Sequence, residues 1–138
     1  MNTTKTYYRI ALTLFTIAIV YAVANSFINY DAIVLKFQQL GYPTYLIYVT
    51  GAAQLLGLTI ILLNKGKWLI EWAYAGFFMN FLFGIIAHLL AKDGNGAAAV
   101  VCLVLVWVTY IQNKKLKYHK ETPKAKKNEE PKSYIKVA

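Results

Sequence analysis

The sequence predicts an all-α integral membrane protein: a four-helix bundle with a short interfacial helix between the first two spans and a disordered basic C-terminal tail. Composition is the first observation behind this fold class, since 58% of the 138 residues are hydrophobic and the mean hydropathy is +0.42. Soluble domains contain about 45–50% apolar residues. The second observation is that the apolar residues gather in four segments, each close to the ~17–25 residues that cross a bilayer. The chain length allows one membrane domain.

The four apolar segments define the predicted spans. They cover about residues 9–27, 43–63, 68–90 and 96–111. The membrane domain that they build is predicted to occupy residues 1–113. We expect the first segment to remain as a span, because it lacks the small-residue cleavage site of a signal peptide. The fourth segment is the shortest, so it needs Gln112 and Asn113 at the membrane interface.

A short amphipathic helix is predicted between the first and second spans. The stretch NYDAIVLKFQQLGYP (29–43) is too short and too polar to cross the bilayer. Its apolar residues recur at helical spacing, at Ile33, Val34, Phe37 and Leu40. We therefore expect a helix that lies along the membrane interface and ends at Gly41 and Pro43.

The tail, residues 114–138, holds much of the charge. It contains nine of the 15 Lys and Arg residues and three of the six acidic residues, which gives it a net charge of +6 out of a total of +9. Many lysines, two prolines and few apolar residues predict disorder here. The lysines either bind anionic lipid headgroups or act only as a topology signal. Because the basic charge is local, no nucleic acid partner is expected.

Loop charges predict the orientation. With four spans, both termini and the 64–67 loop share one side of the membrane. Outside the tail, the charges on this side are Lys5, Arg9, Lys65 and Lys67. The opposite side has Lys36 and Lys92, each accompanied by an aspartate. The positive-inside rule then predicts a multi-pass protein of the cell membrane with both termini in the cytoplasm.

Small residues on one face of the third span predict where another helix packs. This stripe consists of Ala73, Gly76, Asn80, Gly84, Ala87 and Ala91. Small residues at such spacing let helices approach closely within a membrane. The second span has a matching face, with Thr50, Gly51, Gln54, Gly57 and Ile61. We therefore expect the third span to be the packing hub of the bundle.

Two amides lie at similar depth on these faces, Gln54 and Asn80. An unpaired amide in hydrocarbon costs several kcal/mol. One expectation is therefore a hydrogen bond between the two side chains. The other is that both amides, together with Thr50, form the polar floor of a ligand pocket.

The ends of the third span carry two ionisable residues. Glu71, at the cytoplasmic end, is expected to pair with Lys65 or Lys67 of the adjacent loop. His88 lies near the outer end, where Asp93 can pair with it.

His88 permits a structural and a functional interpretation, since ionisable groups within a membrane are functional candidates. In the functional interpretation, Asn25 and Tyr21 of the first span join His88 near the outer interface. The three side chains then hydrogen-bond a quinone headgroup.

Several kinds of chemistry lack the residues that they need. Cys102 is the single cysteine, so an intrachain disulfide and a C-x-x-C redox site are excluded. His88 and His119 are predicted on opposite sides of the membrane, and no metal-ligand spacing or second haem ligand is evident. The sequence also lacks a Gly-rich phosphate loop, a nucleophile elbow and paired carboxylates. It therefore favours a protein without catalytic activity.

Four motifs add a family resemblance. They are LGYP (40–43), GAAQLLG (51–57), EWAYAGF (71–77) and AHLLAKDG (87–94). Over about residues 7–112, the chain resembles the DoxX-like family of small four-span membrane proteins. The resemblance implies a four-helix bundle in the bacterial inner membrane. Some relatives are associated with quinol oxidase and thiosulfate:quinone oxidoreductase complexes, and distant animal relatives act as assembly or cargo factors.

The chain departs from the family at the two amides. Many relatives have Lys at the position of Gln54 and an acid at that of Asn80. The paired change implies that these positions are in contact, and it argues against a proton-handling role taken from the family.

These observations favour a non-catalytic membrane accessory or assembly factor, or a bundle that binds a lipophilic ligand. A membrane-protein partner or a homo-oligomer is expected alongside the lipid bilayer. The alternative is a quinone-linked redox component of a membrane oxidoreductase complex, with quinone as its cofactor.

Overall fold

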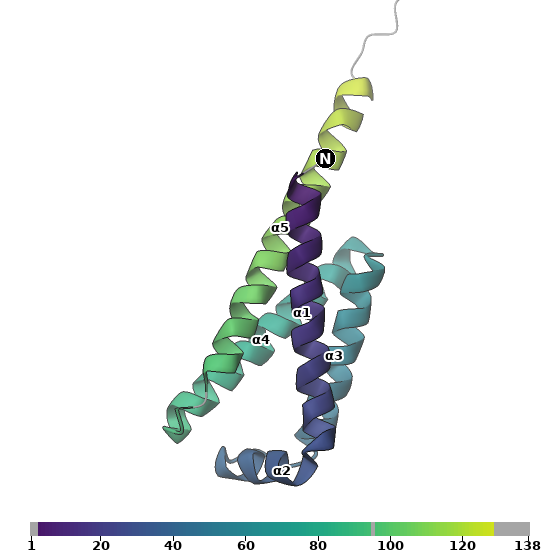
Figure 1. Cartoon of the computed structure of the whole chain (residues 1–138). Coiled ribbons are helices and arrows are strands. Elements are labelled where there is room, and N and C mark those ends of the chain that lie inside the picture. The colour runs from purple at the N-terminus through teal and green to yellow at the C-terminus, as the bar shows by residue number, and fades with distance from the viewer. Residues whose placement is uncertain (1–2, 95, 129–138) are drawn as a thin grey trace, which may run out of the picture.

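All regular secondary structure in the described part of the chain is helical. The computed structural model describes residues 3–94 and 96–128, with the backbone alone described for 119–128. The helices are α1 (Thr3–Ile28), α2 (Tyr30–Gln39), α3 (Leu46–Leu63), α4 (Lys67–Ala91) and α5 (Ala97–Asn128). Figure 1 shows α2 lying across one end of the bundle that α1, α3, α4 and α5 form.

The four predicted membrane spans are confirmed. Helices α1, α3, α4 and the 97–118 part of α5 are long and apolar enough to cross a membrane, with hydropathies of 1.5 to 2.1. Even the shortest, the 18-residue α3, is about 27 Å long at 1.5 Å per residue. The protein is therefore a multi-pass membrane protein.

The connection between α3 and α4 is a tight hairpin. Asn64 ends α3 in the left-handed conformation, with φ 50°, and its N–H binds the carbonyl of Ile60. Gly66 follows with φ 78° and directly precedes α4. A left-handed residue cannot continue a right-handed helix, so two such residues within three positions reverse the chain sharply.

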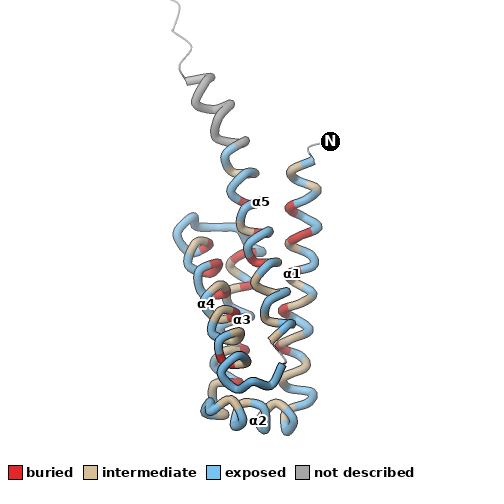
Figure 2. Tube along the Cα trace, turned by 90° about the vertical axis from the view of Figure 1, so that its left-hand side faces the viewer, coloured by how far each residue is buried: buried red, intermediate tan, exposed pale blue. Residues whose placement is uncertain are grey.

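The helices pack in a closed cycle. Helix α1 contacts α3 and α5, and α4 contacts the same two helices from the other side. Figures 1 and 2 show that α2 lies at the end of the bundle opposite the projecting part of α5. The predicted interfacial helix is confirmed as α2, which is followed by Gly41 with φ 76°.

The core lies mainly toward the end where α3 turns into α4. Its fully buried side chains include Phe15, Ile19, Ile61 and Val106. Phe15 and Phe77 pack edge to face, with 5.0 Å between ring centroids. Large side chains therefore fill this half of the bundle, whereas the half near α2 is less completely packed.

The buried face of α4 overlaps in part with the predicted small-residue stripe, since Ala73 and Ala87 belong to both. It consists of Ile70, Ala73, Tyr74, Phe77, Phe81 and Ala87. Gly76 is exposed, and a Cβ added there meets nothing within 4 Å. Aromatic side chains of α4 interdigitate with side chains of the neighbouring helices. Large residues rather than small ones therefore fill most of the interface between α4 and these helices.

Two glycines do lie at close contacts, as predicted. A Cβ at Gly57 of α3 lies 3.0 Å from the ring of Phe77, so this glycine makes room for the aromatic side chain. A Cβ at Gly84 lies 3.7 Å from Ala99 of α5.

Helix α5 extends beyond the predicted end of the fourth span. The sequence placed that end at residue 111 and predicted disorder from residue 114, but the helix continues to Asn128. Extension of an existing helix is easier than nucleation of a new one, and Lys and Leu are good helix formers. Residues 114–128, the first part of the predicted tail, thus continue helix α5. Residues 129–138 lie outside the described residues.

Candidate ligand cavity

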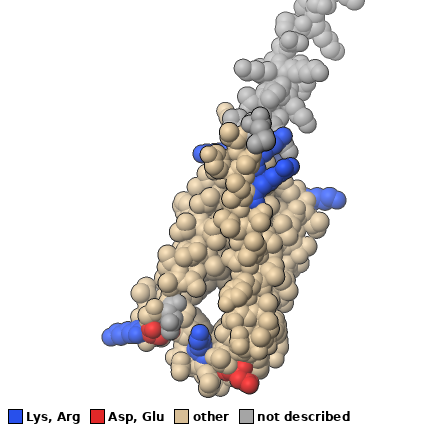
Figure 3. Space-filling model, in the orientation of Figure 1, with Lys and Arg blue, Asp and Glu red and all other residues tan. Residues whose placement is uncertain are grey.

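A central cavity of about 650 Å³ lies among the helices in the less well packed half of the bundle. All five helices contribute to its wall, which includes Phe37 of α2 and the residue that follows this helix, Leu40. Figure 3 shows the corresponding hollow in the surface, near the end of the molecule opposite the projecting α5. The volume lies within the ~300–1,000 Å³ range of small-molecule sites.

Small side chains explain why space remains here. The wall includes Ala22, Gly51, Gly84, Ala87, Ala98 and Ala99, which come from α1, α3, α4 and α5. Figure 1 shows the α4–α5 hairpin diverging from α1 and α3 at this end. Because the helices separate where their side chains are short, these side chains cannot fill the interior.

Gln54 and Asn80 both line the cavity, from α3 and α4. The predicted hydrogen bond between them is not formed, and neither side chain makes a hydrogen bond within the described part of the chain. Each amide therefore retains an NH₂ group that can donate and a carbonyl oxygen that can accept. Both side chains are half-buried, in a part of the protein that lies within the bilayer.

Two hydroxyl residues add hydrogen-bond acceptors to the cavity wall. Thr50 donates its hydroxyl to the carbonyl of Leu46 at 2.7 Å, and Ser26 donates to that of Ala22 at 2.9 Å. Both Thr50 and Ser26 line the cavity. Since each hydroxyl proton is already engaged within its own helix, the oxygen lone pairs are what a ligand can use.

His88 lies in the cavity wall and pairs with Asp93, as predicted. Its Nδ1 lies 2.7 Å from Asp93 Oδ2 and 2.9 Å from Oδ1. The carboxylate holds Nδ1 in the donor role, which leaves Nε2 as the ring atom that can meet a ligand.

Asn25 and Tyr21 do not join His88 in the cavity. Asn25 accepts a hydrogen bond from Asn29 at 2.7 Å, and Tyr21 is 70% exposed. The buried face of α1 carries Phe15, Ile19 and Val23, which places Tyr21 away from the interior. The same helical spacing continues to Ser26, a cavity residue that the sequence analysis missed.

The family assignment rests on a match over most of the chain. The sequence model of the DoxX-like family matches residues 10–109. The chain belongs to the DoxX-like family. The matched region of this DoxX-like protein includes α3, α4, most of α1, the first part of α5 and every cavity residue named above. Comparisons with curated proteins and with solved structures gave no match.

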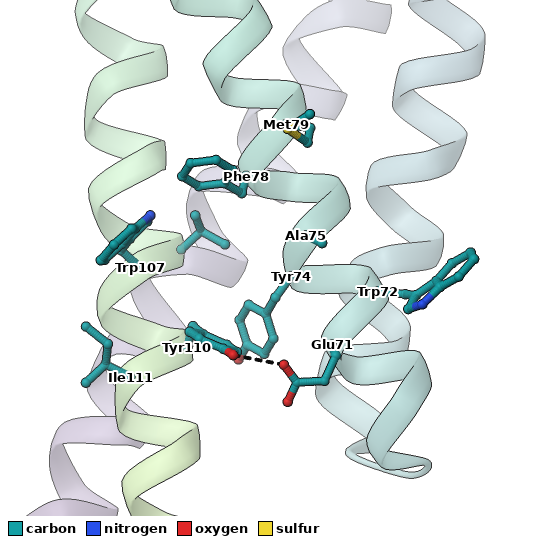
Figure 4. A pocket seen from close by; sticks show the side chains of 10 residues that line it. Glu71, Trp72, Tyr74, Ala75, Phe78, Met79, Trp107, Tyr110 and Ile111 are labelled. Carbon is teal, nitrogen blue, oxygen red and sulfur yellow. Dashed lines mark hydrogen bonds between the residues drawn. The ribbon is translucent and has the colours of Figure 1, made fainter.

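A second polar cluster in the DoxX-like bundle lies at the opposite end, around Glu71. The sequence analysis placed its ion pair within the 64–67 loop, but the structure pairs Glu71 Oε1 with Lys114 Nζ of α5 at 2.9 Å. Tyr110 donates its hydroxyl to Glu71 Oε2, also at 2.9 Å (Figure 4). Residues so far apart in the sequence share no periodic pattern, so their contact could not be predicted from the sequence.

Asn113 belongs to the same end of the bundle. Its side chain is 2% exposed and donates through Nδ2 to the Tyr74 hydroxyl at 3.4 Å. Within the described structure, its buried Oδ1 has no hydrogen-bond partner.

Metal-ligating residues do not cluster in the part of the chain that the structure describes. No group of three or more His, Cys, Asp or Glu residues is placed to hold a metal ion there. The half-buried Cys102 lines the central cavity as a single thiol.

Proposed function

We propose that this DoxX-like protein is a non-catalytic membrane protein that binds a lipophilic molecule in its central cavity. The observation that carries this proposal is the position of Gln54 and Asn80, which face one cavity without hydrogen-bond partners in the described structure. Polar groups within a bilayer are normally satisfied, because an unpaired amide there costs several kcal/mol. A ligand with carbonyl or hydroxyl groups provides the missing partners.

The cavity wall suits such a ligand. Most of the lining side chains are apolar, and the polar ones include Ser26 of α1, Thr50 and Gln54 of α3, and Asn80 and His88 of α4. Ligand sites commonly combine an apolar wall with a few polar groups that fix orientation. Residues of α2 form part of the wall, so we propose that the ligand enters from the membrane interface on that side.

The proposal includes an accessory role. A bundle that holds a lipophilic molecule can supply it to a membrane-protein partner or to a second copy of the chain. The lysine-rich end of the molecule, visible in Figure 3, supports an orientation with both termini in the cytoplasm. It also supports contact between the basic tail and anionic headgroups.

A quinone-linked redox role is the second candidate. The His88–Asp93 pair supports it, because a histidine at the cavity wall can hydrogen-bond a quinone carbonyl. Tyr21 and Asn25 give no such support, since neither lines the cavity.

The test is to purify the protein gently from membranes and identify bound small molecules by mass spectrometry. We expect one lipophilic species at near-stoichiometric amounts in the wild type. The double variant Gln54→Leu/Asn80→Leu should lose it, because both amide groups are removed. The control variant Thr59→Leu changes an exposed polar residue on α3 and should retain the ligand.

Two outcomes contradict the proposal. One is the same set of bound molecules in the wild type and the double variant, and the other is a folded wild type with none. A bound quinone, with quinol turnover that is lost in His88→Ala, supports the redox candidate instead.

A further inference from the structure

We propose that α2 is a hinged lid on the central cavity, which opens when the apolar face of α2 moves from the bundle to the membrane interface. This inference rests on the proposed function, because a lid controls the exchange of a ligand that the cavity holds. Figure 1 shows α2 lying across one end of the bundle. Phe37 of α2 lines the cavity, together with Leu40 and Tyr42 that follow the helix. The helix therefore lies where it can cover the cavity.

Helix α2 turns its apolar residues toward the bundle and its polar residues away from it. Ile33, Val34 and Phe37 are half-buried. The charged and amide residues of the helix are exposed, namely Asp31, Lys36, Gln38 and Gln39. An amphipathic helix in this orientation separates the cavity from water.

The bundle holds α2 only loosely. None of the residues of α2 is buried. In contrast, Phe15 of α1 and Ile61 of α3 are fully buried. Tertiary packing supplies most of the stability of a helix in a protein, so α2 can leave the bundle while the other helices stay in place.

The membrane interface offers the apolar face of α2 a second position. Helix α2 begins two residues after α1, a membrane span, and so lies close to the interface. Amphipathic helices bind there with the apolar face at the boundary between headgroups and acyl chains. Opening thus exchanges one apolar environment for another and keeps this face out of water.

Both ends of α2 have a residue suited to a hinge. Asn29, between α1 and α2, has the non-helical angles φ −106° and ψ 42°. Gly41, after α2, has φ 76°. Hinges are commonly a few residues at the ends of an element, where the backbone angles can change. Glycine adopts positive φ at little cost, whereas a residue with a Cβ does not.

Cys102 can report opening, because it is the single cysteine of the chain and lines the cavity. The experiment treats the full-length protein in lipid nanodiscs with N-ethylmaleimide and follows modification of Cys102 by mass spectrometry. If α2 covers the cavity, the labelling rate follows the fraction of molecules in which α2 is open.

Gly41→Ala tests the hinge without changing the cavity wall. A Cβ at Gly41 meets no atom within 4 Å in the described structure, so the variant opposes the positive φ but adds no clash. We expect Cys102 to be labelled about tenfold faster, because the closed position of α2 needs this φ. Gly66→Ala is the matched control. It places the same strain, at φ 78°, in the α3–α4 turn and should leave the rate unchanged.

A second pair of variants tests the cover. Phe37→Ala/Leu40→Ala should label about fivefold faster, because it removes apolar contacts that hold α2 over the cavity. Leu35→Ala is the matched control, since Leu35 is 58% exposed on α2 and should not affect the rate. Circular dichroism and melting curves verify that each variant is folded.

Equal labelling rates in Gly41→Ala and the wild type overturn the lid. Equal acceleration in Gly41→Ala and Gly66→Ala also overturns it, because the effect is then general destabilisation. A Phe37→Ala/Leu40→Ala rate no higher than that of Leu35→Ala shows that α2 does not cover the cavity. These rates require no bound ligand, so a failure of the lid is distinguishable from the absence of a co-purifying molecule, which contradicts the proposed function.

Discussion

Two glycines on facing helices differ in what surrounds them. Gly57 gives room to the Phe77 ring, and a Cβ there lies 3.0 Å from it. A Cβ added at Gly76 has no atom within 4 Å. A glycine in a membrane helix is therefore needed for packing only where a neighbouring side chain occupies the space of its missing Cβ.

This difference predicts that replacement by leucine has a larger effect on stability at Gly57 than at Gly76. Gly57→Leu should lower the free energy of unfolding by about 1–3 kcal/mol, because it overpacks the Phe77 contact. Gly76→Leu should change it by no more than about 0.5 kcal/mol, as at other exposed positions. Thermal unfolding in detergent measures both. Equal destabilisation would show that Gly76 also lies at a helix contact.

The helices themselves were largely predictable. Apolar runs of sufficient length indicated four spans, and the spacing of Ile33, Phe37 and Leu40 indicated α2. The faces were less predictable, because aromatic residues on α4 bury a different face from the one that small residues suggested. Contacts between distant segments, such as Glu71 with Lys114, depend on how the helices are arranged and leave no periodic signal.

The ion pair between α4 and α5 should make a measurable but small contribution. Double-mutant cycles with Glu71→Gln and Lys114→Gln should give a coupling energy of about 0.2–1 kcal/mol, since both side chains are partly exposed and screened. A cycle that pairs Glu71→Gln with Lys5→Gln is the control and should give none. Purely additive effects in the first cycle would contradict the contact.

Helix α2 should be the least stable helix of the bundle. None of its residues is buried, and it packs on α1. Local stability follows buried contact, so its amides should exchange hydrogen faster than those at the centres of α1 and α4. Hydrogen exchange with mass spectrometry can resolve peptides from 30–39 and 70–81. Equal protection of these peptides would indicate that α2 is held by contacts outside this chain.

On the scale of the whole molecule, the packed core and the cavity lie toward opposite ends of the bundle. Large side chains fill the half near the α3–α4 turn, and the cavity occupies the half near α2. The sequence left two alternatives for Gln54 and Asn80, a mutual hydrogen bond or the polar floor of a pocket, and it could not predict the volume of the cavity. That volume depends on how far the helices diverge, and no local sequence pattern predicts this divergence.

The charge distribution predicts the orientation of the whole bundle. In a Cys102→Ala background, Lys36→Cys should react from outside the cell with a membrane-impermeant maleimide, because it lies on the less basic side. Lys65→Cys is the matched control and should react only after the cells are opened. The reverse pattern would invert the topology.

The length of α5 has a mechanical consequence. Its 32 residues extend about 48 Å, well beyond the ~30 Å of a bilayer core. One end of this rod carries Ala98, Ala99 and Cys102 in the cavity wall, and the other projects from the bundle (Figure 1). A force that tilts the projecting end about its contacts with α1 and α4 moves the cavity wall in the opposite direction. Tilting of α5 as a rigid rod would therefore change the volume of the cavity.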